Sequence, residues 1–396
     1  MTASSRISLR FAAVFCGLYG IYGVLYFVLT LLDGPYNLLF PDFLVFHAAV
    51  RAFFEGKLAL VYDIDAFTGF QNALYVDRFP KPIHFRPFFY PPIWLLMLLP
   101  LGWLAVAKAY GVFMAATAAA ATLVEGRRDW WGWLAIVTSP AAMWTALSGQ
   151  NTFLSLALFY GGFRLIERAP VAAGILLGLL SYKPQIWLLV PLALFAARQW
   201  KVLAWTIATV AILSLTSLGV FGLDFWLAFF DAAREAGSAR VIDETFERIF
   251  MHMTTLLAAA RILGLPPVVA GAIQLAGAVL AIAAVWFAFR RRGTSDARTA
   301  VLVTATFLVS PYTLNYDLLL LMPAAVALFR RGAAEGFYPL ERLVYLALWL
   351  IPTFGMVLNR LDLPVMPPVI LLFGAIAWAR LWSAPRGELP SAATAR

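Results

Sequence analysis

Long apolar runs alternate with short polar intervals along most of the chain. About 20 apolar residues cross a bilayer as a helix, and shorter helices are tolerated where they end in a cavity lined by protein. The runs predict spanning helices over residues 11–32, 104–124, 131–147, 152–166, 171–182, 184–197, 202–221, 267–289, 299–309, 313–329, 340–357 and 365–381. The pattern therefore predicts an all-α polytopic membrane protein with about twelve transmembrane helices.

The basic residues between the runs indicate how the helices are oriented. Residues 91–101 are also apolar, but Pro100 interrupts them, and a run of about eleven residues is too short for a ~30 Å core. We interpret this run as a half-helix that enters from outside. Later basic clusters, such as Arg127 with Arg128, then lie in the cytoplasm, as the positive-inside rule requires. Both termini are predicted to be cytoplasmic, in a multi-pass protein of the inner (plasma) membrane.

The composition agrees with this interpretation. Of the 396 residues, 62% are hydrophobic and only 13% are charged, whereas soluble domains carry roughly 25% charge. The net charge of +9 is explained by Lys and Arg in cytoplasmic loops, so it does not indicate nucleic-acid binding. Cys16 is the single cysteine, which excludes an intrachain disulfide.

Two longer segments fall on the outer side in this topology, residues 33–90 and 222–266. Both mix charged residues with aromatic residues at helical spacing, so we expect interfacial helices along the outer surface, including one over residues 251–263. Asp63 and Asp65 fit a solvated loop better than a metal site. The whole of residues 1–386 is predicted to form one domain, followed by a disordered cytoplasmic tail over residues 387–396.

Unusual polar residues gather at the predicted outer ends of the helices. They come from five segments that are distant in sequence, and the candidates are Asp42, His47, Arg86, Tyr90, Gln150, Asn151, Lys183, Tyr316 and Asp317. A carboxylate beside hydrocarbon is costly unless it has a task or a partner. Convergent polar groups in an apolar bundle predict a site for an amphipathic ligand.

Each candidate also has a purely structural interpretation. Asp42 can cap the helix that follows it, and His47 can be a core residue. Lys183 can extend to the interface along its aliphatic stem. Gln150 and its neighbour can satisfy a helix end, and Asp317 can cap the next helix or pair with Lys183.

The chain has no motif for a nucleotide, a cofactor or a metal. It contains no P-loop, no Gly-x-Gly-x-x-Gly, no Cys-x-x-Cys and no His-Glu-x-x-His. An outward site without a nucleotide needs an activated lipid or an ion gradient. We therefore predict no cofactor and no metal.

Several short segments, in order and spacing, resemble one known family. They are Asp42-Phe43, Phe89-Tyr90-Pro91-Pro92 with Leu99-Pro100-Leu101, Gly149-Gln150-Asn151, the stretch from Gly178 to Lys183-Pro184, Arg198-Gln199-Trp200-Lys201, and Ser310-Pro311 to Asp317. Over residues 10–331 the chain resembles the polyprenol-phosphate-mannose-dependent mannosyltransferases of glycosyltransferase family 87, which have the GT-C superfold.

The resemblance implies an inverting hexosyltransferase. It would move a sugar, typically mannose, from a polyprenyl-phosphate donor to a lipid-linked or glycan hydroxyl on the periplasmic, extracytoplasmic face. Asp42 falls on the family's proposed base, and Lys183 with Arg86 would stabilise the leaving phosphate. The polyprenyl chain would lie in a lipid-facing groove lined by Phe88, Phe89 and Trp94.

Two other functions remain open at this point. A transporter or flippase with the same cavity would need polar residues through to the inner face, and inverted repeats would support it. The sequence shows neither feature. A structural subunit of a membrane assembly is the other alternative.

Overall fold

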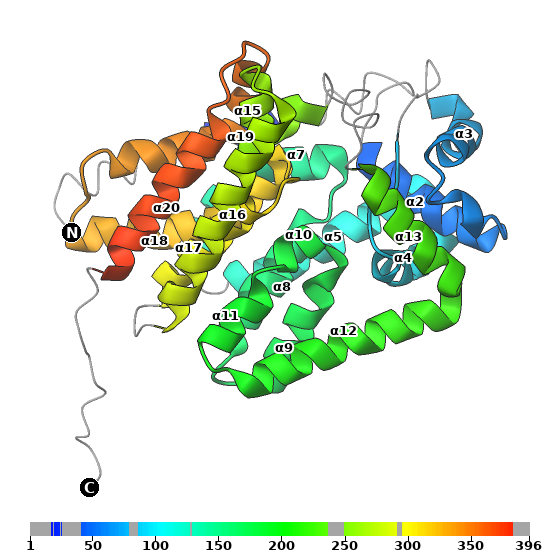
Figure 1. Ribbon diagram of the computed structural model, residues 1–396, viewed down its shortest axis with the longest axis horizontal. Helices are drawn as coiled ribbons and strands as arrows, with labels where there is room; N and C mark the ends of the chain where they lie inside the picture. Colours follow the sequence, from blue (N-terminus) through cyan, green and yellow to red (C-terminus); the bar gives the residue numbers. More distant parts are fainter. Residues whose placement is uncertain are drawn as a thin grey trace, which may run out of the picture.

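The computed structural model describes residues 17–18, 20–23, 25, 41–78, 86–126, 129–236, 249–290 and 295–382. Within these ranges the chain is helical, and β-structure is limited to an isolated bridge between Met253 and Leu314. The predicted all-α class is therefore confirmed for the described residues. Figure 1 shows α16 (Pro267–Arg290) to α20 (Met366–Trp382) gathered at one side, and α2 (Pro41–Phe54) with α3 (Ile64–Leu74) at the other.

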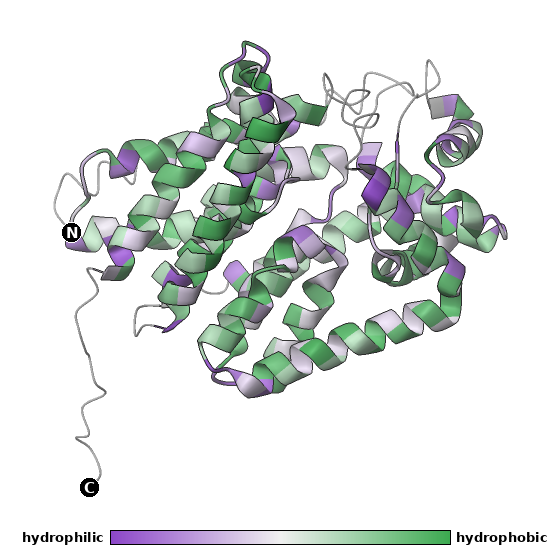
Figure 2. Cartoon of the chain, viewed as in Figure 1, coloured by the Kyte–Doolittle hydropathy of each residue, from purple (hydrophilic) through white to green (hydrophobic). Residues whose placement is uncertain are grey.

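Four described helices are long and apolar enough to cross a membrane, namely α5 (Val106–Glu125), α12 (Trp200–Phe221), α16 and α19 (Glu341–Asn359). Figure 2 colours most of α12 and α16 as hydrophobic along their length, and on α12 Ile207, Ile212 and Leu215 are exposed. Such exposure is expected of helices that face lipid. These helices support a membrane protein, but the count of about twelve spans stays a prediction. The first predicted span, residues 11–32, lies mostly outside the described residues.

Several predicted spans are broken helices. Residues 131–147 were predicted as one helix, but they form α6 (Trp130–Val137) and α7 (Pro140–Ser148), because Ser139 caps a new helix that has Pro140 in its first turn. The other interrupted spans are α9 (Pro170–Leu179) with η4 (Leu180–Tyr182), α10 (Pro184–Trp187) with α11 (Val190–Ala196), and η6 (Asn315–Leu321) with α18 (Met322–Glu335). Residues 91–101, predicted as a half-helix, form α4 (Pro92–Leu98) and the start of η3 (Leu99–Trp103). The remaining elements are η1 (Leu58–Leu60), η2 (Val76–Arg78), α8 (Thr152–Leu165), α13 (Leu223–Ala236), η5 (Phe250–His252), α15 (Leu256–Ile262) and α17 (Ser295–Val309).

The sequence predicted that α2 would lie along the outer surface, but the structure places it inside the protein. Its residues from Phe43 to Val50 are all buried, and it packs against α4, η3, α5 and α7. The prediction was wrong because the apolar residues of α2 occupy every face rather than one stripe, which is typical of a helix inside the protein. Burial of α2 places its first turn, with Asp42, inside the bundle.

The expected helix over residues 251–263 is also divided. The described residues form η5 and α15, and between them Met253 pairs with Leu314 while Thr255 caps α15 through Ala258 N–H. Residues 237–248 of the same predicted outer segment lie outside the described residues. The bridge therefore ties this segment to the turn that leads into η6.

Candidate active site

The first turn of α2 presents Asp42 to the interior of the bundle. Its Oδ2 accepts a hydrogen bond from Gln150 Nε2 at 2.8 Å. An acidic residue in a first turn is also favoured by the helix dipole. Among the described residues, Asp42 Oδ1 accepts no hydrogen bond, and the side chain remains partly exposed. Gln150 thus holds Oδ2 in place, and Oδ1 is available to a ligand.

The turn between α7 and α8 positions Gln150 and Asn151. Gly149 ends α7 with a φ of 70°, a left-handed conformation that glycine adopts without a Cβ penalty. Gln150 Oε1 accepts from the Tyr90 hydroxyl at 3.1 Å and from Asn151 N–H at 3.3 Å. Because the amide oxygen has these two donors, the NH2 group is the end that faces Asp42.

A buried ion pair lies next to this turn. Lys183 Nζ donates to Asp317 Oδ1 at 2.5 Å and to Asn151 Oδ1 at 3.0 Å, and its side chain is 1% exposed. Lys183 precedes Pro184, which disfavours helical backbone at Lys183 and ends η4 there. The Tyr316 ring centroid lies 5.6 Å from the ammonium. Lys183 therefore does not extend to a solvated interface.

Asp317 is held from several directions. Its Oδ2 accepts from Leu314 N–H at 3.1 Å, and its Oδ1 accepts from the Thr152 hydroxyl at 3.4 Å as well as from Lys183. The two structural interpretations of Asp317, capping and pairing with Lys183, both describe what it does in the fold. Thr145 on α7 also donates to the Tyr316 carbonyl at 3.5 Å, which fixes η6 beside α7.

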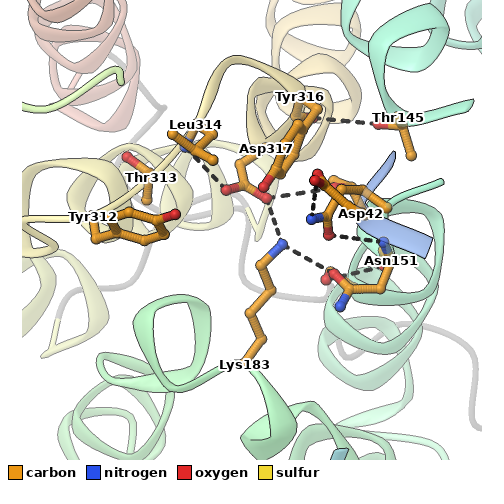
Figure 3. A network of polar contacts seen from close by, with 12 residues as sticks. Asp42, Thr145, Asn151, Lys183, Tyr312, Thr313, Leu314, Tyr316 and Asp317 are labelled. Atoms are coloured by element: carbon orange, nitrogen blue, oxygen red, sulfur yellow. Dashed lines mark hydrogen bonds and ion pairs between the residues drawn. The ribbon is translucent and has the colours of Figure 1, made fainter. Parts of the chain in front are cut away.

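Hydrogen bonds join these residues into one connected path. The path runs from Asp42 through Gln150, Asn151 and Lys183 to Asp317. Figure 3 shows Asp42, Asn151, Lys183 and Asp317 converging from separate segments of the chain. Three of the five are charged, and all five come from segments that the sequence analysis selected. We call this group the polar cluster.

Asp42 and Arg86 influence each other electrostatically. Burial raises the pKa of the Asp42 carboxyl, while the Gln150 hydrogen bond and the charges of Arg86 and Lys183 act in the opposite direction. Desolvation lowers the pKa of Arg86, and Asp42 opposes that change. Arg86 Nη1 donates to the Pro41 carbonyl at 3.0 Å, next to Asp42 in sequence. Arg86 therefore provides positive charge at the start of α2.

Aromatic side chains pack next to residues of the polar cluster. Trp94 stacks on Tyr182 with ring centroids 4.4 Å apart, and Phe46 meets the Tyr90 ring edge-on at 5.2 Å. The Tyr182 hydroxyl pairs with Ser155 Oγ at 2.9 Å. The predicted lipid-facing groove is wrong in part, because Phe88 and Trp94 are each 1% exposed and pack inside the protein.

His47 lies outside the polar cluster. Its Nδ1 pairs with the Tyr75 hydroxyl at 2.8 Å and its Nε2 with the Leu104 carbonyl at 3.0 Å. These bonds join α2 to the end of α3 and to the residue after η3. The described contacts give His47 a part in holding α2, and they do not bring it to Asp42.

Some cluster residues were not selected from the sequence. Thr152 and Tyr182 each adjoin a selected residue in sequence, and both hydrogen-bond within the cluster or to its neighbours. Their adjacency to Asn151 and Lys183 was the signal that could have identified them.

Within the described ranges there is no group of three His, Cys, Asp or Glu placed for a metal. Asp63 caps α3 by accepting from Ala66 N–H at 2.9 Å.

Residues 88–311, more than half of the 396-residue chain, match the profile of Glycosyltransferase family 87. The chain belongs to glycosyltransferase family 87. No curated protein and no solved structure matches it. Together with the long apolar helices, membership identifies a membrane glycosyltransferase of family 87, which uses a sugar donor and an acceptor. The matched residues include Gln150, Asn151 and Lys183, whereas Asp42 and Asp317 lie outside them and join the same site through the bonds described above.

Proposed function

We propose that this family-87 enzyme transfers a sugar, mannose in the first instance, from a polyprenyl phosphate to a hydroxyl of a lipid-linked or glycan acceptor on the outer face of the membrane. The observation that carries the proposal is the connected path from Asp42 to Asp317, because it joins a carboxylate to an ammonium within one site. The resemblance of the sequence motifs to the mannosyltransferases of the family supplies the donor class.

Asp42 is the general base of the proposed reaction. Its Oδ1 accepts no hydrogen bond from the described residues, so it can receive the proton of an acceptor hydroxyl, while Gln150 holds Oδ2 in place. A raised pKa makes a carboxylate a stronger base, and burial acts on Asp42 in that direction. Both features support Asp42 in this role.

Lys183 is the proposed partner of the leaving phosphate. An ammonium can donate three hydrogen bonds, and two of these go to Asp317 and Asn151. One N–H therefore remains for a phosphate oxygen. Because Asp317 fixes the ammonium before substrate binds, little reorganisation is needed when negative charge develops on the leaving group. Arg86, which lies on the Asp42 side, adds positive charge to the same site.

The proposed reaction is a single displacement with inversion. The acceptor oxygen forms a bond to the anomeric carbon as the bond from that carbon to the phosphate oxygen breaks. The acceptor proton passes to Asp42 Oδ1, and the polyprenyl phosphate departs with the electron pair of the broken bond. No further reactant is required, and the proton of Asp42 returns to water when the products leave.

The test uses the purified full chain in lipid nanodiscs. The protein is incubated with polyprenyl-phosphate mannose, the corresponding glucose donor or a nucleotide sugar, together with lipid-linked and free glycan acceptors, and the product mass is measured. We expect product from a polyprenyl-phosphate donor only. Asp42→Asn should lower turnover by about 10²–10⁴-fold, the usual contribution of a positioned base. Asp63→Asn removes an acid that caps an outlying helix and should retain turnover.

Two outcomes would overturn the proposal. One is product formation from the nucleotide sugar alone, which removes the lipid donor. The other is wild-type turnover by Asp42→Asn in a correctly folded protein, which removes the base. Movement of a solute across vesicles without any glycosylated product would instead favour a transporter.

A further inference from the structure

The helix α13 begins where the long apolar helix α12 ends. Gly222 follows α12 with a φ of 85°, a left-handed conformation that glycine adopts without a Cβ penalty. The chain turns there, and Figure 1 shows α13 leaving the end of α12 at an angle and running back beside α4. Because α12 is long and apolar enough to cross a membrane, its end lies near a membrane surface, and α13 starts at that level.

One side of α13 packs against the rest of the protein. The centroid of the buried Phe225 ring lies 4.6 Å from that of Tyr62 and 5.4 Å from that of Phe221. The Phe229 ring lies 5.7 Å from Tyr62 on the same measure, and Ala232 is buried. Positions 225, 229 and 232 fall within about 60° around the helix axis, because an α-helix has about 3.6 residues per turn. They form a single face, which internal packing accounts for.

The opposite side of α13 is apolar and uncovered. Leu223, Leu227 and Phe230 are 61%, 51% and 51% exposed. They also fall within about 60° of one another, so they form one line of side chains over about two turns. We call these three residues the apolar stripe. Along the chain the stripe continues the exposed apolar surface of α12, which reaches Val220, so the apolar partner expected for both is lipid.

The acidic residues of α13 lie on a third side. Asp224, Asp231 and Glu235 fall within about 40° of one another, between the apolar stripe and the packed face. Charges are unfavourable in hydrocarbon, so this acidic side faces water. Trp226 lies on the side away from the acids, with its ring 6.0 Å from that of Phe230, and Trp is favoured at membrane–water interfaces.

We propose that α13 lies in the interface of the bilayer leaflet nearest the polar cluster, with its apolar stripe among the acyl chains and its acidic side in water. An amphipathic helix that lies in the plane of the interface has this arrangement of faces. Arg234, in the last turn, borders the stripe, and its long side chain can reach the lipid headgroups. This lipid contact goes beyond the proposed function and does not depend on which sugar is transferred.

Two tyrosines join α13 to the polar cluster. Tyr62, which packs on Phe225 and Phe229, donates its hydroxyl to the Tyr90 carbonyl at 2.7 Å. The Tyr90 hydroxyl in turn binds Gln150. The depth of α13 in the membrane therefore also indicates the depth of the polar cluster. The headgroup region is where a lipid phosphate lies, as the proposed donor requires.

The experiment measures the depth of single side chains in lipid nanodiscs. Cys16, the single cysteine of the sequence, is replaced in Cys16→Ser, and Leu227→Cys, Asp231→Cys or Ile212→Cys is added and labelled with a fluorophore. Quenching is measured with lipids brominated near the headgroup or near the end of the acyl chain, and with iodide in solution. All three side chains are exposed, so each variant should unfold at the wild-type temperature.

The three labels should be quenched differently. We expect the Leu227→Cys label about 5–10 Å into the boundary between headgroups and acyl chains, the usual depth of an interfacial apolar face. The Asp231→Cys label should be quenched mainly by iodide. The Ile212→Cys label, near the middle of α12, should be quenched mainly by the deeper bromine.

Three results would overturn the inference. Iodide quenching at Leu227→Cys without bromine quenching would place the stripe in water. A Leu227→Cys label that neither quencher reaches would show that protein, such as a second copy of the chain, covers the stripe. Similar bromine quenching at Leu227→Cys and Asp231→Cys would place the whole helix within lipid. The measurements need no substrate, so a protein that forms no product refutes the proposed function and leaves this inference standing.

Discussion

Gln150 Nε2 donates to Asp42 Oδ2 at 2.8 Å, although 108 positions separate the two residues. Tyr90 and the Asn151 N–H both bind the amide oxygen of Gln150, so its NH2 group is committed to Asp42. The contact joins the first turn of α2 to the turn after α7. It also sets which carboxylate oxygen is left for a substrate.

Because of this contact, we predict that Gln150→Leu changes the pH dependence of the transfer rate. The Gln150 hydrogen bond favours ionised Asp42, so its loss should raise the pKa of Asp42 further above the ordinary carboxyl value. A general base works when deprotonated, so the acid limb of the rate profile should move to higher pH by about one unit, the usual size of one charge-assisted bond. Turnover measured across pH in the nanodisc assay checks this.

Gln274 provides the matched control for that experiment. It is a buried glutamine that accepts from Leu257 N–H and donates to the Leu308 carbonyl, away from the cluster. Gln274→Leu should lower stability but leave the acid limb at its wild-type pH. An acid limb that moves to lower pH in Gln150→Leu would contradict the assigned direction of the bond.

The raised pKa of Asp42 predicts that the conditions for activity and for stability oppose each other. The pKa of Asp42 is raised in the folded protein, so the folded state binds more protons than the unfolded state at pH values between the ordinary and the raised pKa. The free energy of unfolding should therefore fall as pH rises through that window. Asp42→Asn should remove this dependence and be at least as stable as wild type at neutral pH, as measured by thermal unfolding at several pH values. A less stable Asp42→Asn at neutral pH would show that ionised Asp42 supports the fold.

The ion pair of Lys183 with Asp317 predicts non-additive effects on stability. Lys183→Met leaves a buried carboxylate without its cation, so the free energy of unfolding should fall by about 3–5 kcal/mol. Lys183→Met combined with Asp317→Asn leaves no buried charge of this pair and should be more stable than either single variant. All three variants should lose transfer activity, because the proposed phosphate ligand or its support is missing.

An exposed pair serves as the comparison for that cycle. Arg234 and Asp231 pair at 3.0 Å with side chains that are 80% and 74% exposed. Arg234→Gln should change stability by less than about 1 kcal/mol. Additive losses in the double variant of Lys183 and Asp317 would mean that the two residues stabilise the fold independently.

The close packing of Gly102 against α2 allows a test of whether the position of α2 limits the reaction. A Cβ at Gly102 would overlap Val50 and Phe54, both on α2. Gly102→Ala should therefore displace α2, lower stability by about 1–3 kcal/mol and reduce turnover, because Asp42 moves with the helix. Gly111→Ala on α5, where no atom lies within 4 Å, should keep turnover and stability at or above wild-type values. Full turnover by a destabilised Gly102→Ala would show that the position of α2 does not limit the reaction.

The sequence predicted the class of fold and the members of the cluster better than it predicted the helices. Apolar runs identify a helical membrane protein, and isolated charges such as Lys183 and Asp317 stand out against them. Residues 131–147 form two helices because a single Ser139-Pro140 step begins a new one, and apolar content does not register such a break. The count of about twelve spans stays a prediction.

The hydrophobic pattern of the sequence could not reveal which aromatic side chains are buried or which polar side chains pair. His47 stood five positions from Asp42, but its bonds go to Tyr75 and Leu104, which only the packing of α2 brings near. Phe88 and Trp94 were expected to line a lipid-facing groove for the polyprenyl chain, but both are enclosed by the protein. The 134 positions between Lys183 and Asp317 likewise give no local sign that the two charges meet.

That separation has a consequence for biosynthesis. Lys183 is made and inserted well before Asp317 leaves the ribosome, so its charge lacks its counter-ion while the intervening helices are built. An unpaired charge among apolar helices is unfavourable, and the early half of the protein must tolerate it until the later half arrives. Chains truncated just before η6 should therefore be recognised by membrane quality control and degraded, even though all of α2 to α17 has been synthesised.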